Sequence, residues 1–424
     1  MKLWDKGYTT DNIVDRFTVG KDRILDLKLA KHDITGNIAH AKMLHKINIL
    51  TENELEDILE GLTQIQLTID DGTFTIEENF EDVHSKVEFE LVRLIGDAGK
   101  KIHTARSRND QVLVDLHLYV KEEIEHIIEL TKTLFDTLIT LSDKHKNVLI
   151  PGYTHMQVAM PSSFGLWFSA YAESLIDDVI LLKAAYKISD QNPLGSAAGY
   201  GSSFPIDRTM TTDLLGFKTM KYNVVAAQMS RGKLEKTTAF AMASVAGTLS
   251  KLSADVCLYM SQNFNFLGFP KELTTGSSIM PHKQNPDVFE LMRAKCNKLQ
   301  NMPSEIMMIT NNLTSGYHRD FQLLKENLME GIDTMKDNLE VCNFMLQHII
   351  IKDNILDNDI YDYLYSVEEV NKLVLKGTTF RDAYQQLGKE ILEGNFTPGK
   401  EVNHTHEGSI GNLCLKEIKA KFEM

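Results

Sequence analysis

The chain has 424 residues, 43% of them hydrophobic and 25% charged, which is ordinary for a globular protein and enough for two or three domains. Its net charge of −14 argues against nucleic acid or an anionic membrane as a partner, because both favour a basic surface. No stretch approaches the roughly 18 apolar residues of a membrane-spanning helix. We therefore expect a cytoplasmic protein with no membrane partner, and its four scattered cysteines should be buried thiols without metal-ligand spacing.

The placement of proline predicts the architecture. Residues 1–150 and 304–397 contain none of the nine prolines, and apolar residues recur there three and four positions apart. Such spans form long helices, and we find no convincing alternating strand. We predict an all-α fold with an N-terminal helical domain (1–108), a central elongated bundle of five helices (109–350) and a small C-terminal helical domain (351–424).

In chain order, the N-terminal part carries three shorter helical patterns, the second of which begins with a capping box formed by Thr51 and Glu54. The central part carries the five long patterns, and two short patterns follow. The predicted helices are 24–47, 51–69, 80–95, 109–147, 162–188, 230–263, 286–311, 320–350, 361–376 and 380–393.

The first chemical motif lies just before the first long helix and contains Arg106, Ser107, Arg108 and Asn109. A guanidinium offers a two-pronged donor to a carboxylate, and the N-terminus of a helix favours an anion. The same residues are equally typical of a capped, salt-bridged helix start. The motif alone therefore indicates carboxylate binding without establishing it.

The second motif, residues 152–157, follows Pro151 and contains His155 between Thr154 and Gln157. A lone histidine is more often structural than catalytic. Its position in a glycine- and threonine-containing loop, next to hydrogen-bonding side chains, makes it a candidate proton donor or acceptor.

The third motif, residues 275–287, contains glycine, two serines, two prolines and asparagine between two apolar helical patterns, so it must be a loop. Asn285 followed by Pro286 predicts a helix start at which Lys283 and backbone N–H groups could hold an anion. The structural alternative is a capped surface loop.

The third motif resembles the signature of the fumarase/aspartase/argininosuccinate lyase superfamily, Gly-Ser-Ser-x-Met-Pro-x-Lys-x-Asn-Pro, and matches every fixed position from Gly276 to Pro286. The first motif resembles the argininosuccinate lyase form, Thr-Gly-Arg-Ser-Arg-Asn-Asp-Gln, with Ala105 in place of glycine. The second resembles Gly-Tyr-Thr-His-x-Gln. The resemblance covers nearly the whole chain and implies cleavage of argininosuccinate to arginine and fumarate by β-elimination, without a metal or organic cofactor.

The resemblance also implies roles for individual residues. Ser277 would remove the proton, Lys283 would stabilise the resulting anion together with Asn285, and His155 paired with Glu290 would support protonation of the leaving nitrogen. The substrate-binding positions that it implies are His84, Arg106, Ser107, Arg108, Asn109, Thr154, Gln157, Arg231, Ser278, Asn285, Tyr317, Gln322 and Lys325.

Some features leave alternatives open. The family usually begins Trp-Gly-Gly-Arg-Phe where this chain has Trp4-Asp5-Lys6-Gly7-Tyr8, and residues 17–33 are about two residues longer than usual. An N-acylated argininosuccinate is therefore a possible substrate. A sister lyase that releases fumarate from adenylosuccinate, malate or aspartate is a second alternative, and a non-catalytic crystallin-like protein is a third.

The spacing of the motifs predicts a homo-oligomer. The first and second motifs lie at opposite ends of a helix that is roughly 55 Å long at 1.5 Å per residue. One extended helix cannot bring them together, so a shared site needs neighbouring copies of the chain. The resemblance implies a tetramer in which three chains contribute to each site.

Overall fold

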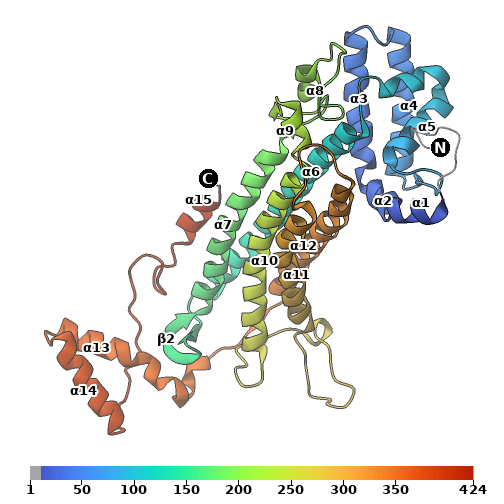
Figure 1. Ribbon diagram of the computed structural model, residues 1–424. Helices are drawn as coiled ribbons and strands as arrows, with labels where there is room; N and C mark the ends of the chain where they lie inside the picture. The colour runs from blue at the N-terminus through green and yellow to red at the C-terminus, as the bar shows by residue number, and fades with distance from the viewer. Residues whose placement is uncertain (1–10, 424) are drawn as a thin grey trace. The chain divides into compact units, whose positions relative to one another are not determined.

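The computed structural model describes residues 11–423, and helices dominate them (Figure 1). The predicted all-α class is confirmed. The divergent residues Trp4 to Tyr8 lie outside the described residues. The described residues divide into two compact units: unit 1 comprises residues 11–128, 180–244 and 298–335, and unit 2 comprises residues 129–179, 245–297 and 336–423.

All five predicted long helices are present, and the division into two units falls within each of them. The first carries a continuous stripe of fully buried residues that includes Leu113, Ile124 and Leu138, as its apolar spacing predicts. Most predicted ends lie a few residues beyond the observed ones, because turns and short 3-10 helices flank the rods, but the first helix begins one residue earlier and the second ends one residue later than predicted. The five are α6 (Arg108–Lys144), α7 (Phe164–Ser189), α10 (Lys233–Met260), α11 (Asp287–Thr310) and α12 (Leu324–Gln347).

Unit 1 contains the N-terminal helices, which pack around a buried cluster that includes Leu44, Leu62 and Leu91. The capping box at Thr51 is confirmed, since its side chain accepts from Glu54 N while the Glu54 carboxylate accepts from Thr51 N. The remaining elements of the unit are α1 (Asn12–Val19), α2 (Asp22–Leu25), η1 (Asp26–Leu29), α3 (Ala30–Lys46), α4 (Glu52–Asp70), α5 (Val83–Ile95), η2 (Gly96–His103), the parallel pair β3 (Gln191–Asn192) and β4 (Thr219–Met220), α8 (Arg208–Leu214), α9 (Val224–Gln228) and η4 (Arg319–Leu323).

Unit 2 contains a β-hairpin that the sequence analysis did not predict. Its strands β1 (Leu149–Thr154) and β2 (Gln157–Ser163) pair antiparallel, with Pro151 opposite Pro161. A two-stranded ribbon tolerates proline because each strand has a free edge where no backbone N–H is needed. The other elements are β5 (Leu267–Gly268) paired with β6 (Ile350–Ile351), η3 (Lys271–Leu273), η5 (Ile355–Asp357), η6 (Asp359–Tyr365), α13 (Ser366–Leu375), α14 (Phe380–Leu392) and α15 (Leu415–Glu423).

The cysteine prediction is half right. Cys296 and Cys342 are buried, whereas Cys257 and Cys414 are only partly buried, and all four are free thiols. Among the helices of residues 11–423, none is long and apolar enough to cross a membrane.

Candidate active site

A charged cavity of about 250 Å³ lies in unit 1. It collects seven predicted substrate-binding residues from segments far apart in the sequence: His84, Arg108, Asn109, Arg231, Tyr317, Gln322 and Lys325. Six further residues of its wall were not predicted: Asp22, Asp26, Glu81, Asp82, Val112 and Arg319.

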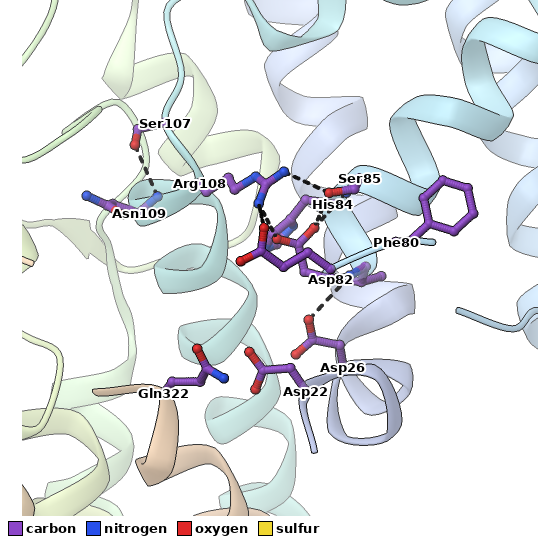
Figure 2. Close-up of polar contacts among 12 residues, drawn as sticks. Asp22, Asp26, Phe80, Asp82, His84, Ser85, Ser107, Arg108, Asn109 and Gln322 are labelled. Atoms are coloured by element: carbon purple, nitrogen blue, oxygen red, sulfur yellow. Dashed lines mark hydrogen bonds and ion pairs between the residues drawn. The ribbon is translucent and has the colours of Figure 1, made fainter. Parts of the chain in front are cut away.

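Arg108, the first residue of α6, is held by the segment that leads into α5 (Figure 2). Its Nη1 lies 2.9 Å from a Glu81 carboxylate oxygen and 3.0 Å from an Asp82 oxygen, and its Nη2 donates to Ser85 Oγ at 2.9 Å. The guanidinium is thus fixed at the cavity wall by two carboxylates. An incoming substrate carboxylate would have to share or replace these partners.

Lys325 is a buried cation of the cavity. Its Nζ lies 2.6 Å from Asp26 Oδ1 and 2.9 Å from Asp22 Oδ1. Burial and the neighbouring Asp26 raise the pKa of Asp22 to about 6, although Lys325 opposes the shift. Burial disfavours the charged ammonium, but the two carboxylates outweigh it and raise the pKa of Lys325. The ammonium group therefore stays charged.

The backbone at the end of α1 reaches the same cavity wall. Gln322 Nε2 donates to Thr18 O at 2.7 Å and to Val19 O at 3.0 Å, and Arg319 Nη2 donates to Thr18 O at 2.8 Å. Two side chains from η4 therefore anchor the stretch in which this chain differs from the family.

Arg231 is buried, and its ion-pair partner is Glu235, one helical turn further on, at 3.0 Å. Its Nη2 also donates to Phe321 O. The carboxylate that pairs with this arginine therefore comes from the first turn of α10.

Two predicted residues of the first motif do not line the cavity. Arg106 is buried, and its Nη1 donates to Asn37 Oδ1 at 2.5 Å. Ser107 Oγ instead accepts from Asn109 N at 3.2 Å, which caps the start of α6. Ala105 has a positive φ of 63°, a left-handed conformation that glycine adopts freely and alanine adopts only at some conformational cost.

In unit 2 the second motif forms the tip of the β-hairpin. His155 and Met156 both adopt the left-handed conformation, with φ of 54° and 60°, and connect β1 to β2. This tight turn leaves Thr154, His155 and Gln157 exposed. The imidazole is therefore available to a ligand.

The third motif, also in unit 2, forms a loop closed at its base by a backbone pairing of Thr275 with Asn285. Ser277 Oγ accepts from Met280 N at 3.2 Å, with Ile279 N at 3.4 Å, so backbone dipoles point at the serine oxygen. Such donors favour a negatively charged oxygen. Lys283 and Ser278 are exposed on the same loop.

The helix after this loop begins one residue later than predicted. α11 starts at Asp287, and Pro286 precedes it and accepts the first helical hydrogen bond from Glu290 N at 3.0 Å. The Asn285 amide bonds to Thr275 Oγ1 and Gly276 O, so it braces the loop and does not cap the helix. Glu290 is exposed, and within residues 11–423 it shares no hydrogen bond with His155.

The missed cavity residues carried a weak sequence signal. Glu81 and Asp82 belong to a stretch in which only His84 was singled out. Asp22 and Asp26 lie in the 17–33 segment, where the chain departs from the family pattern. Acidic residues at such positions resemble any solvated surface, and only the fold turns them toward Arg108 and Lys325.

Comparisons with known proteins show the family to which the chain is related. A family model described as lyase matches residues 6–300. An argininosuccinate lyase from Parabacteroides distasonis is 59% identical over 99% of this chain and 94% of that protein. The argininosuccinate lyase from Thermotoga neapolitana is 39% identical over 92% of this chain and 98% of that protein.

Two solved structures share the fold. EDDS lyase in complex with formate has a TM-score of 0.77 at 19% identity, covering 98% of this chain and 90% of that chain. A fumarate lyase from Mesorhizobium sp. BNC1 has a TM-score of 0.72 at 16% identity, covering 92% and 89%.

Proposed function

We propose a residue-level mechanism for this chain, which belongs to the argininosuccinate lyase family and cleaves argininosuccinate to arginine and fumarate. The reaction is a β-elimination. A proton leaves the carbon beside one succinyl carboxylate, the C–N bond to the guanidino group breaks, and the electron pair forms the double bond of fumarate. The guanidino nitrogen gains a proton and leaves as arginine.

Ser277 is the proposed base. A serine hydroxyl is a weak base at its ordinary pKa, so the site must favour its alkoxide. The backbone N–H groups of Ile279 and Met280 point at Oγ, and Lys283 lies on the same loop. Lys283 and Asn285 would then stabilise the dianionic carboxylate that forms when the proton is lost. This loop is the observation that carries the proposal.

His155, supported by Glu290, would deliver the proton to the leaving nitrogen. The exposed hairpin tip presents the imidazole, and the first turn of α11 presents the carboxylate. No hydrogen bond joins the two side chains within residues 11–423, so the pair would form between loops of neighbouring chains.

The cavity in unit 1 would bind the substrate and fix its position. Argininosuccinate carries three carboxylates, and the cavity offers Arg108, Lys325 and His84 as cations, with Asn109, Tyr317 and Gln322 as neutral hydrogen-bonding groups. The neighbouring acids keep the cavity near neutrality and would pair with the cationic groups of the substrate.

We further propose a homotetramer whose active sites combine residues of neighbouring chains. The 37 residues of α6 make a rod roughly 55 Å long, with the first motif at its start and the second motif after its end. The long helices also expose large apolar side chains, which another copy of the chain could cover. They include Phe240 at 50% exposed, Leu291 at 63%, Met308 at 71% and Phe344 at 46%.

We propose that the enzyme acts in the cytoplasm, because its four thiols are unpaired, as is usual in a reducing compartment.

Product analysis tests the proposed substrate. Purified protein should release fumarate and arginine in equal amounts from argininosuccinate, and little from adenylosuccinate, malate, aspartate or N-acylated argininosuccinate. Faster turnover of any of these four would overturn the substrate assignment.

A further inference from the structure

We propose that Asp33 is a positioning residue that holds His84 as a charged hydrogen-bond donor at the wall of the unit 1 cavity. The inference rests on the proposed function of that cavity in binding a substrate carboxylate. No sequence motif singled out Asp33, which lies in α3, about fifty residues before the histidine that it contacts.

The hydrogen bond between Asp33 and His84 is short and buried. His84 Nδ1 lies 2.7 Å from Asp33 Oδ1, and the two side chains are 3% and 0% exposed. The second carboxylate oxygen of Asp33 accepts from Asn37 Nδ2 at 2.8 Å, and Asn37 Oδ1 in turn accepts from Arg106. A row of buried groups therefore fixes Asp33, and Asp33 fixes the ring.

The orientation of the ring follows from this contact. With Nδ1 committed to Asp33, the other nitrogen, Nε2, makes no hydrogen bond within residues 11–423, and His84 lines the cavity. Nε2–H is then the donor available to a ligand. The role that the family resemblance assigns to His84 thus depends on a partner behind the cavity wall.

The same contact keeps the ring charged. Burial disfavours the imidazolium, but Asp33, followed by Asp115 and Asp82, outweighs it and raises the pKa of His84 to about 9. Asp115 lies 3.6 Å from Nδ1, and burial, reinforced by repulsion from Asp33, raises its own pKa well above its usual value. Asp33 is therefore the carboxylate that balances the imidazolium. The titratable groups that act on His84 are Asp33 from α3, Asp82 at the cap of α5, His103 at the end of η2 and Asp115 from α6.

Asp33, His84 and Asp115 could also hold a metal ion, since one ligand atom from each lies within 4.8 Å of the others. The 2.7 Å contact has the length of a charge-assisted hydrogen bond, and the buried Arg106 adds positive charge to the same cluster. These observations favour a protonated histidine over a metal.

The sign of the pH effect follows. In the native enzyme the imidazolium persists until the pH rises through about 9, so substrate affinity is retained below that value. The substitution Asp33→Asn keeps the shape and removes the charge, and the pKa of His84 should fall to or below its ordinary value of about 6.5. Affinity should then be lost at a lower pH.

The test measures KM and kcat between pH 6 and 9.5 for the native enzyme, Asp33→Asn, His84→Gln and the double variant. We expect Asp33→Asn to raise KM about tenfold at pH 8, and to approach the native KM near pH 6, with kcat changed less than about threefold. In the His84→Gln background, Asp33→Asn should change KM less than about twofold, because its effect passes through the ring. The control Asp115→Asn should change KM less than about threefold, since Asp115 lies 3.6 Å from Nδ1 and, unlike Asp33, makes no hydrogen bond with the ring.

The outcomes separate the two proposals. If His84→Gln leaves KM unchanged, the cavity does not use His84 to bind substrate and the proposed function of that wall fails. If His84→Gln raises KM but the Asp33→Asn effect is the same at every pH or multiplies in the double variant, only the role of Asp33 is overturned. Should Asp33→Asn fail to assemble, the native profile decides alone: an alkaline limb near pH 9 that His84→Gln abolishes supports the inference, and a limb near 6.5 contradicts it.

Discussion

At the scale of single residues, the proposed chemistry depends on the Ser277 oxygen, which accepts hydrogen bonds from the backbone N–H groups of Ile279 and Met280. Ser277→Ala removes the proposed base and leaves the loop pairing of Thr275 with Asn285 in place. We expect kcat for fumarate release to fall at least about a thousandfold, with KM changed little. The matched control is Ser304→Ala, an exposed serine of α11, which should keep native turnover. Retention of a tenth of native kcat in Ser277→Ala would remove the serine from the mechanism.

Ala105 adopts a backbone conformation that is unfavourable for alanine. The family uses glycine there, and this alanine adopts a φ of 63°, which costs an alanine roughly 1–2 kcal/mol. Ala105→Gly should therefore raise the free energy of unfolding by up to about 1 kcal/mol, after the greater chain entropy of glycine is subtracted. Chemical denaturation of the native protein and the variant measures this change in the free energy of unfolding. Ala184→Gly, at an exposed position within α7, should instead lower stability by about 1 kcal/mol, and the same sign for both variants would contradict the argument.

At the scale of elements, helices were predictable because apolar periodicity and proline placement act over many residues. The structure contains the five predicted long helices and the predicted capping box at Thr51. The β1–β2 hairpin was not predictable in this way, since each strand is short and carries a proline, and its pairing depends on contacts between the strands. The three-domain division remains a prediction.

The site residues that were predicted are those that belong to sequence motifs of the family. Arg108, His84 and Lys325, far apart in the sequence, do line one cavity. Their acidic partners, among them Asp22 and Asp33, were not predicted, because a buried ion pair is specified by the packing of separate helices and leaves no local pattern.

The end of α6 and the start of α7 meet so closely that only glycine fits. A Cβ at Gly165 would lie 2.5 Å from Lys146 Cα and 2.8 Å from Ser142 O, both of which are backbone atoms that cannot move aside. Gly165→Ala should lower stability by about 1–3 kcal/mol and reduce turnover, because the same junction carries the hairpin that holds His155.

Gly388→Ala in α14 is the matched control, since a Cβ there meets nothing within 4 Å. Replacing glycine within a helix should stabilise it by roughly 0.5–1 kcal/mol. Thermal unfolding followed by circular dichroism compares the two variants, and equal effects would show that the close approach at Gly165 is unimportant.

At the scale of the whole molecule, the account requires several copies of the chain. The second and third motifs belong to loops of unit 2, and the cavity residues belong to unit 1, so the proposed chemistry needs both sets around one substrate. Sedimentation of the native protein should give a tetramer near four times the 48.0 kDa chain mass. A monomer that keeps full activity on dilution would refute this arrangement.

Subunit mixing tests the central claim most directly. We expect His155→Asn and Ser277→Ala each to inactivate the enzyme, and both change exposed or half-buried loop residues, so assembly should survive. If the two side chains reach each site from different chains, randomly mixed oligomers should regain about a quarter of native activity, because each contributing chain is intact at the required position in half of the cases. Mixed oligomers that stay as inactive as the separate variants would show that one chain supplies both residues, and would contradict the account.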